Sequence, residues 1–330
     1  MATDKSNLIV FKCNANSQTG FGHVSRCLNI ATRLKRQKPE QEIVFCGDYL
    51  PFATQQIEDQ GFGCITDFAA INPPFCLIID DYQINQDDIN HWRDKAEHLI
   101  AIDDFNHFDL SQCDLVINFR VGFDNEPYNA KNTCLGAKFF PFKSSLQAIR
   151  EDNLSTTKTS LDNIFIFIGG QDQHNTGMKL MTALDNLLSG KVINLVTATT
   201  TADKPIPSSR NTLWLKPLTS KIEHYYQAAD YFISGGGLSK YEVSFCGIAN
   251  ACISQNQGQA EDSVVFAKHG LTTDLGLVDS FLLSPEQSLT TLVADIEAPA
   301  QSALISASKQ TFDTHSCRAL ADHILKRCYD

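Results

Sequence analysis

The sequence predicts an α/β protein with two similar halves, each a parallel sheet covered by helices. Short apolar runs rich in β-branched and aromatic residues alternate with longer amphipathic runs, and this series occurs twice along the 330 residues. Strands that alternate with helices form βαβ units with parallel pairing. A chain of this length with 43% hydrophobic residues can bury two separate cores. Two halves in tandem suggest a cleft between them.

The first half contains five runs expected to be strands. They are residues 8–13, 42–47, 75–81, 98–104 and 113–119. The amphipathic segment 23–37 is expected to be the helix that follows the first strand. The polar stretch 144–161 is poor in strand formers, and we interpret it as a linker.

The second half repeats the pattern. Its expected strands are residues 163–170, 191–198, 211–217, 230–237 and 250–254, with a helical segment at 176–190. Residues 315–328 form an amphipathic helix with basic residues near its end, as the helix dipole favours. The predicted organisation is an N-terminal domain (1–143), the linker (144–161), a C-terminal domain (162–314) and a terminal helix (315–330).

Composition excludes several classes of function. The net charge is −11, and the short basic run at 33–38 reads as the solvated end of a helix, so no nucleic-acid partner is expected. The 11 cysteines include no C-x-x-C pair and several lie in apolar runs, which is typical of reduced, buried thiols. Without a signal peptide or an 18-residue apolar segment, we expect a cytoplasmic protein with no stable membrane insertion.

The stretch "TGFGHVSR" places a histidine at the junction of the first strand and first helix. Gly20 and Gly22 allow close approach of a ligand, and free N–H groups at a helix start attract anions. A helix N-terminus disfavours imidazolium, which would keep His23 neutral as a general base requires. Alternatively, His23 caps the helix or fills a polar pocket. Ser25 breaks the dinucleotide fingerprint, although Asp48 could imitate its ribose-binding acid.

A second glycine-rich stretch, "ISGGGLSKYE", follows an apolar run in the second half. Gly236 and Gly237 would cradle a diphosphate with backbone amides, and the helix-borne Glu242 would offer a carboxylate to ribose hydroxyls. The alternative is a tight strand-to-helix turn whose polar residues face solvent. Spacing alone does not decide between them.

Two acidic pairs, Asp80–Asp81 and Asp103–Asp104, end strands of the first half. Adjacent residues of an extended chain point to opposite faces, so at most one acid of each pair should face a ligand. The remaining acids would cap helices or bind loop amides. No compact His/Asp cluster accompanies them, so we expect no metal site.

Taken together and in order, these motifs resemble the UDP-sugar hydrolases of pseudaminic acid biosynthesis. The resemblance rests on "SQTGFGHVSRCL", "LIIDDYQI", "IDDF" followed by "CDLVIN", "FIGGQD", "ISGGGLSKYE" and "QNQ", and it spans residues 8 to about 275. That family is similar to the GT-B glycosyltransferases, in particular the N-acetylglucosaminyltransferase that makes the lipid intermediate of peptidoglycan. The resemblance implies two Rossmann-like domains with a nucleotide-sugar cleft between them, that is, a GT-B-like fold.

The implied reaction is hydrolysis of UDP-2,4-diacetamido-2,4,6-trideoxy-β-L-altropyranose with inversion, without a metal or redox cofactor. We expect the protein to be a monomer. His23 falls on the catalytic histidine. The implied substrate-binding residues are Gly20, Gly22, Tyr82, Asp81 and Asp104. The implied UDP-binding residues are Gly169, Gly170, Gly236, Gly237, Leu238, Ser239, Glu242 and Asn256.

The chain departs from the family at four places. Lys12 and Asn14 stand where the family has "R-x-D", and Phe139 and Lys143 stand at the Tyr and Arg places of "Y-x-L-L-R". Loss of a bidentate guanidinium and a phenol could change which sugar is held. Two alternatives stay open: a GT-B glycosyltransferase that passes the sugar to an acceptor, and a non-catalytic nucleotide-sugar binding protein.

Overall fold

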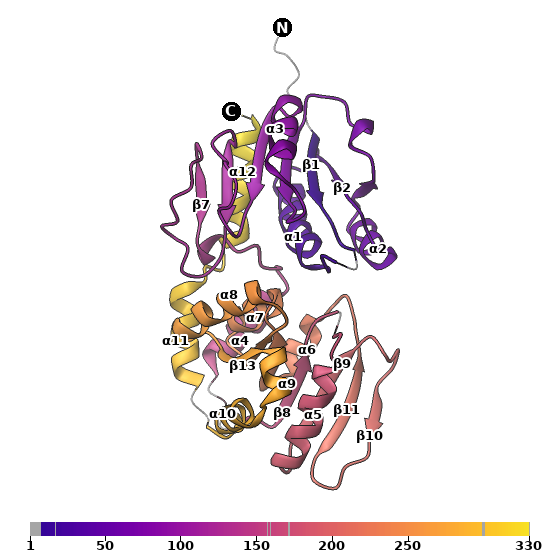
Figure 1. Ribbon diagram of the computed structural model, residues 1–330, viewed down its shortest axis with the longest axis vertical. Coiled ribbons are helices and arrows are strands. Elements are labelled where there is room, and N and C mark those ends of the chain that lie inside the picture. The colour runs from indigo at the N-terminus through magenta and orange to yellow at the C-terminus, as the bar shows by residue number, and fades with distance from the viewer. Residues whose placement is uncertain are drawn as a thin grey trace. The chain divides into compact units, whose positions relative to one another are not determined.

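The computed structural model describes residues 8–16, 18–156, 158, 160–170, 172–298 and 301–329. The chain forms two compact units (Figure 1). Unit 1 combines the chain up to Lys143 with the segment from Asp313 onward, and unit 2 spans Ser144–Phe312. Ser17 and Gln171, which belong to two of the motifs above, lie outside the described residues.

Unit 1 contains a sheet of seven described strands in the order β3-β2-β1-β4-β5-β6-β7, all of them parallel. The strands are β1 Leu8–Cys13, β2 Glu42–Cys46, β3 Gly63–Ile65, β4 Cys76–Asp80, β5 His98–Ile102, β6 Leu115–Asn118 and β7 Thr133–Leu135. Its helices are α1 Gly22–Gln37, α2 Pro51–Asp59, α3 Gln86–Lys95 and α12 Ser316–Tyr329, with 3-10 turns η1 Phe68–Ala70 and η2 Ala137–Phe139. The five strands predicted in this half are confirmed.

Unit 2 repeats this design. Its seven described strands run in the order β10-β11-β9-β8-β12-β13-β14, and β10 is antiparallel to β11. The strands are β8 Asn163–Phe167, β9 Val192–Thr197, β10 Lys204–Ile206, β11 Thr212–Pro217, β12 Tyr231–Gly235, β13 Ala249–Ser254 and β14 Thr273–Leu277. The helices are α4 Leu146–Ser155, α5 Thr176–Leu187, α6 Glu223–Ala228, α7 Leu238–Phe245, α8 Gln257–Lys268, α9 Val278–Leu283, α10 Glu286–Glu297 and α11 Gln301–Thr311.

Each sheet reverses its strand order at one point, and that point positions the candidate sites. In unit 1 the reversal lies between β1 and β4, and in unit 2 it lies between β8 and β12. Ligands of open α/β sheets bind beyond the carboxyl ends of the strands at such a switch point. The segment after β1 leads to His23, and the first acidic pair lies at the end of β4, with Asp80 as its last residue. The segments after β8 and β12 carry Gly169 and Gly170, and Gly236 and Gly237.

The C-terminal helix belongs to unit 1, although it is more than 300 residues from β1. α12 packs against α1. The Ser316 hydroxyl donates to the Phe140 carbonyl oxygen over 2.6 Å, and the buried Cys328 contacts Cys76 of β4. The stretch 144–161 contains α4, whose buried Arg150 donates to the Ser308 hydroxyl of α11 over 2.7 Å inside unit 2.

The described part of the chain includes no helix long and apolar enough to cross a membrane. The 11 cysteines are free, and most are buried. Burial raises the pKa of Cys113 and of Cys134 to about 12, so these thiols stay protonated at neutral pH.

Candidate functional site

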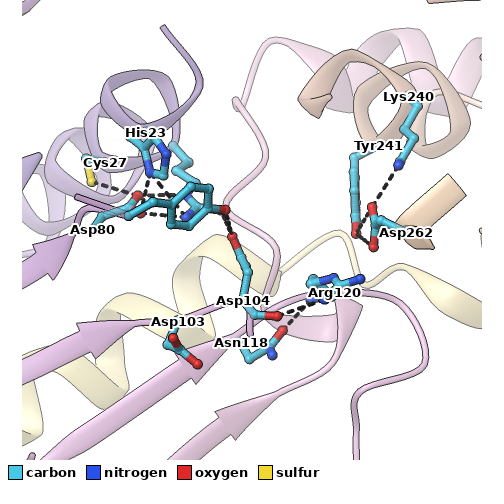
Figure 2. Close-up of polar contacts among 12 residues, drawn as sticks. His23, Cys27, Asp80, Asp103, Asp104, Asn118, Arg120, Lys240, Tyr241 and Asp262 are labelled. Carbon is cyan, nitrogen blue, oxygen red and sulfur yellow. Dashed lines mark hydrogen bonds and ion pairs between the residues drawn. The ribbon is translucent and has the colours of Figure 1, made fainter. Parts of the chain in front are cut away.

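His23 lies in the first turn of α1 and is hydrogen-bonded to Asp80, the last residue of β4. Its Nδ1 atom is 2.6 Å from Oδ1 of Asp80 (Figure 2), and the histidine is only 7% exposed. Asp80 is completely buried. Because the ionised carboxylate only accepts hydrogen bonds, Nδ1 of a neutral His23 must carry the proton. Nε2 then holds the lone pair, which is the tautomer that a general base needs.

Arg26, one helical turn after His23, holds the Asp80 carboxylate. Its Nε donates to Asp80 Oδ2 over 2.6 Å and its Nη2 donates to Oδ1, a bidentate pair. Burial alone would raise the carboxyl pKa, but the charge of Arg26 and the hydrogen bonds from Arg26 and His23 outweigh it and hold the pKa of Asp80 well below its ordinary value. The carboxylate is therefore ionised throughout the neutral range.

The same guanidinium reaches a second carboxylate. Nη1 of Arg26 donates to Oδ2 of Asp104 over 2.8 Å, and Arg26 is 5% exposed. Burial lowers the pKa of this guanidinium, but Asp104 and Asp80 more than compensate, so the net shift is upward. Two carboxylates and one guanidinium leave these three buried groups with a charge of −1.

Tyr82 closes the cluster on its exposed side. Its hydroxyl donates to Asp104 Oδ2, and its ring meets the His23 imidazole edge to face with centroids 4.3 Å apart. Burial of the hydroxyl and the Asp104 charge raise the pKa of Tyr82 well above its ordinary value, so it remains a phenol. The other oxygen of Asp104, Oδ1, is buried and has no hydrogen-bond partner among the described residues. It can accept a hydrogen bond from a ligand.

The second acid of the first pair has different partners. Asp81 Oδ2 accepts from Lys12 Nζ over 3.0 Å and from Asn14 Nδ2 over 2.8 Å. Asn14 also accepts from the Asp48 backbone N–H. Asp80 and Asp81 thus divide between opposite faces of β4, as alternation along a strand requires. Lys12 and Asn14, two of the departures from the family pattern, act together on Asp81.

Gly20 and Gly22 build the loop that leads into α1. Gly20 has a φ of +66° and donates its N–H to the Asn16 carbonyl oxygen, which closes a tight turn. Gly22 is the first residue of the helix. Of the sequence-predicted residues of unit 1, His23, Tyr82 and Asp104 come together in one cluster, whereas Asp81 belongs to the neighbouring network of Lys12 and Asn14.

In unit 2 the two glycine segments lie side by side. A Cβ atom on Gly235 would be 2.2 Å from the Ile168 carbonyl oxygen, and one on Gly236 would be 2.7 Å from Ser254 Oγ. Only glycine fits at these two positions. Gly169 and Gly170 directly follow Ile168, and Gln255 Nε2 donates to the Ile168 carbonyl oxygen over 2.6 Å. The loops after β8, β12 and β13 therefore meet at the switch point.

Gly237 is the N-cap residue of α7, so Leu238 and Ser239 are the first helical residues. Lys240, one residue further along, is completely buried and is hydrogen-bonded to the loop that carries Gly236 and Gly237. Its Nζ atom donates to the Gly236 carbonyl oxygen over 2.9 Å and forms a 2.7 Å ion pair with Asp262 (Figure 2).

The remaining predicted residues of unit 2 are engaged with the protein. Glu242 is 7% exposed, and its Oε2 accepts from the Tyr226 hydroxyl over 2.7 Å. Ser239 is also hydrogen-bonded to Tyr226. The side chain of Asn256 caps α8 by accepting from the Gln259 N–H over 3.0 Å, which leaves its amide group directed elsewhere. These contacts fix the geometry of the loops that follow β12 and β13.

The sequence analysis assigned no role to Arg26 or Lys240, and of the pair Asp80–Asp81 it assigned the site residue to Asp81 and not to Asp80. A signal existed for Arg26, because it lies three residues after His23 on the same helix face. Strand alternation separates Asp80 from Asp81 but does not say which one faces α1. Among the described residues, no group of three or more His, Cys, Asp or Glu side chains is arranged to hold a metal ion.

Solved structures that match both units of the chain identify its fold class. The Acinetobacter baumannii MurG structure covers 96% of this chain and 99% of its own length with a TM-score of 0.63 at 14% identity. The Arabidopsis thaliana UGT89C1 structure covers 97% and 99% with a TM-score of 0.60 at 10% identity. The fold is that of the GT-B glycosyltransferases. The α/β class and the two Rossmann-like domains predicted from sequence are confirmed.

Curated relatives are more similar in sequence. Protein MJ1062 of Methanocaldococcus jannaschii, whose function is uncharacterised, is 26% identical over 269 residues, 74% of this chain and 55% of its own. The spore coat polysaccharide biosynthesis protein SpsG of Bacillus subtilis is 28% identical over 200 residues, 58% of each chain. This chain thus spans little more than half the length of these relatives. No protein-family model matches the chain.

Proposed function

We propose that this protein is a nucleotide-sugar hydrolase that releases UDP from UDP-2,4-diacetamido-2,4,6-trideoxy-β-L-altropyranose or a close relative. The observation that carries the proposal is the His23–Asp80 pair, in which a buried, ionised carboxylate fixes the imidazole tautomer with its lone pair on Nε2. The GT-B fold supports a nucleotide-sugar ligand, and the name of the Bacillus subtilis relative supports a role in polysaccharide biosynthesis.

In the proposed reaction, Nε2 of His23 takes a proton from water as the water oxygen bonds to the anomeric carbon. The bond from that carbon to the diphosphate oxygen breaks, and its electron pair leaves with UDP. Asp80 stabilises the imidazolium that forms, as the acid of a catalytic triad does. General-base catalysis of this kind contributes roughly 10²–10⁴-fold.

The proposed contacts of the substrate divide between the units. In unit 1, Asp104 Oδ1 would accept from a hydroxyl or amide of the sugar, and Tyr82 and the loop with Gly20 and Gly22 would border it. In unit 2, the N–H groups at Gly237, Leu238 and Ser239 would bind the diphosphate, since a helix N-terminus favours anions. Gly169, Gly170, Gly236, Glu242 and Asn256 are proposed to complete the UDP site, with Glu242 on the ribose.

The test is UDP release without an acceptor. The protein is incubated with the altropyranose substrate and, separately, with common UDP-hexoses, and UDP is measured over time. The proposal expects rapid release of UDP from the first substrate and release slowed roughly 10²–10⁴-fold in His23→Gln. Release only after an acceptor is added would instead identify a glycosyltransferase, and binding without release would identify a nucleotide-sugar binding protein.

A further inference from the structure

An exposed strip of aromatic rings extends from the catalytic histidine. The Tyr82 ring touches His23, the Phe105 ring lies 5.0 Å from Tyr82, and the His107 ring stacks on Phe105 at 5.5 Å. Tyr82 is 48% exposed and Phe105 is 38% exposed. We call these three residues the aromatic strip. Large apolar rings left exposed together beside a reacting group indicate a binding surface.

The strip borders a cavity inside unit 1. Tyr82, Phe105 and His107 all line a cavity of about 250 Å³ at the carboxyl ends of β4 and β5, beside α3. The rest of its wall is largely apolar and includes Ile79, Ile84, Ile89, Ala101, Leu110 and Cys113. The same tyrosine therefore touches the catalytic histidine and the cavity.

The two carboxylates in the wall do not make the cavity polar. Asp81 is hydrogen-bonded by Lys12, Asn14 and the Gln83 N–H. Asp103 accepts from the Asn106 N–H over 2.6 Å and from the Tyr128 hydroxyl over 2.7 Å. Because these acceptors are already paired, the cavity favours an apolar occupant over a hydroxyl-rich one.

The volume of the cavity further limits which chemical group can occupy it. A single water needs only roughly 10–15 Å³ of cavity volume, so a cavity of about 250 Å³ has room for a chain of several carbon atoms. That exceeds a hydroxyl, a methyl or an acetyl group, and a hexose ring is too polar for this wall. An unbranched chain of four to six carbons fits both the size and the lining.

We propose that the aromatic strip and this cavity form a subsite for an N-acyl substituent on the hexose of the nucleotide sugar, and that it accepts chains longer than acetyl. The inference rests on the proposed function, because the amide-linked acyl group is carried by the sugar that His23 acts upon. The amide end lies along Tyr82 and Phe105, and the acyl tail enters the cavity between Ala101 and Leu110.

Binding measured without turnover tests the subsite independently of catalysis. The affinity of His23→Gln is measured by calorimetry for UDP-2,4-diamido-trideoxy-altrose analogues in which one amide, at C2 or at C4, carries an acetyl, butanoyl or hexanoyl group. Each methylene that enters an apolar cavity contributes about 0.8 kcal/mol, which is about fourfold in affinity. One of the two series should therefore bind about 15-fold more tightly on going from acetyl to butanoyl.

Two substitutions that fill the cavity, Ala101→Leu in β5 and Ile84→Phe in the loop before α3, should remove this gain. Cys113→Ala, which enlarges the same cavity, should keep it and is the matched control. UDP alone should bind all variants equally, because its proposed site lies in unit 2. Equal affinity along both series, or a gain that survives both filling variants, overturns the subsite. The proposed hydrolase function is tested separately, by UDP release from the diacetamido sugar nucleotide.

Discussion

Substitution of Asp80 by asparagine separates a catalytic role of this acid from a structural one. The carboxylate accepts from His23 Nδ1, from two nitrogens of Arg26 and, over 3.4 Å, from the Cys27 thiol. An asparagine keeps one acceptor oxygen and places an NH₂ group at the other position. If the NH₂ group takes the place of Oδ1, it faces both His23 Nδ1 and Arg26 Nη2, so the imidazole must put its proton on Nε2 and cannot act as a base. If it takes the place of Oδ2, it opposes the Nε–H donor of Arg26.

The magnitudes follow from these contacts. Loss of the general base costs roughly 10²–10⁴-fold in kcat, about 3 to 5.5 kcal/mol at 1.36 kcal/mol per decade. Removing one partner of a buried ion pair costs about 3–5 kcal/mol of stability. Arg26 keeps Asp104 as a partner, so we expect the lower end of this range, about 3 kcal/mol.

The assay compares kcat for UDP release with the free energy of unfolding in urea. Asp114→Asn is the matched control, because Asp114 also forms ion pairs, with Arg93 and Lys131, and its pKa is also lowered. The control should lose some stability and keep its kcat. If Asp80→Asn were destabilised but turned over within about threefold of the wild type, then the acid would serve packing only and the proposed base mechanism would be wrong.

The remaining predictions concern acid stability, the glycine loop and two side chains. Because the folded-state pKa of Asp80 is depressed, its stabilising contribution is present above the ordinary carboxyl pKa of about 4 and is lost as pH falls below that value. In urea unfolding between pH 2 and pH 5, Asp80→Asn should therefore lose less free energy of unfolding with falling pH than the wild type. Parallel stability curves for the two proteins would show that the pKa of Asp80 is not depressed. Gly236→Ala should weaken UDP binding at least tenfold in calorimetry, because a Cβ at this position would collide with Ser254 Oγ and would lie 2.9 Å from Gln259 Cβ. A Cβ on Gly237 would lie 3.9 Å from its nearest neighbour, Gln259 Nε2, so Gly237→Ala should have the melting temperature of the wild type. Tyr82 should contribute no phenolate absorbance at pH ~10, where an ordinary tyrosine is half ionised. The absorbance titrations of the wild type and of Tyr82→Phe should therefore coincide up to that pH. A smaller phenolate absorbance in Tyr82→Phe than in the wild type would show that the pKa of Tyr82 is not raised. Glu242→Gln should weaken UDP binding by roughly 10-fold, the effect of losing the proposed charge-assisted hydrogen bond to the ribose. An unchanged affinity would remove Glu242 from the proposed site.

The fold was predictable from sequence because its buried strands are long and apolar. All ten predicted strands are present, with ends that differ by at most a few residues. The four strands that were not predicted are the edge strands of the two sheets. Three of them, β3, β7 and β10, have three residues each, too few to show an alternating pattern, and the fourth, β14, has five residues. The packing of α12 on unit 1 was also out of reach, since nothing local in residues 315–328 says which distant helix they meet.

The candidate site was predictable in part. The positions of His23, Tyr82 and Asp104 near one another follow from the rule that functional residues gather beyond strand ends at a switch point. The sequence did not show that Asp80, and not Asp81, meets His23, because that depends on which face of β4 receives α1. Nor did it show that Lys240 is buried behind the glycine loop, since a lysine in the first turn of a helix usually lies in solvent.

Hydrolysis in water enriched in ¹⁸O tests the central claim most directly. After UDP release from the diacetamido altropyranose substrate, mass spectrometry locates the label and NMR reports the anomer formed first. Attack of His23-activated water on the anomeric carbon predicts one ¹⁸O in the sugar hemiacetal, none in UDP, and an inverted anomer. Label in the UDP phosphate, or a retained anomer, would contradict the mechanism.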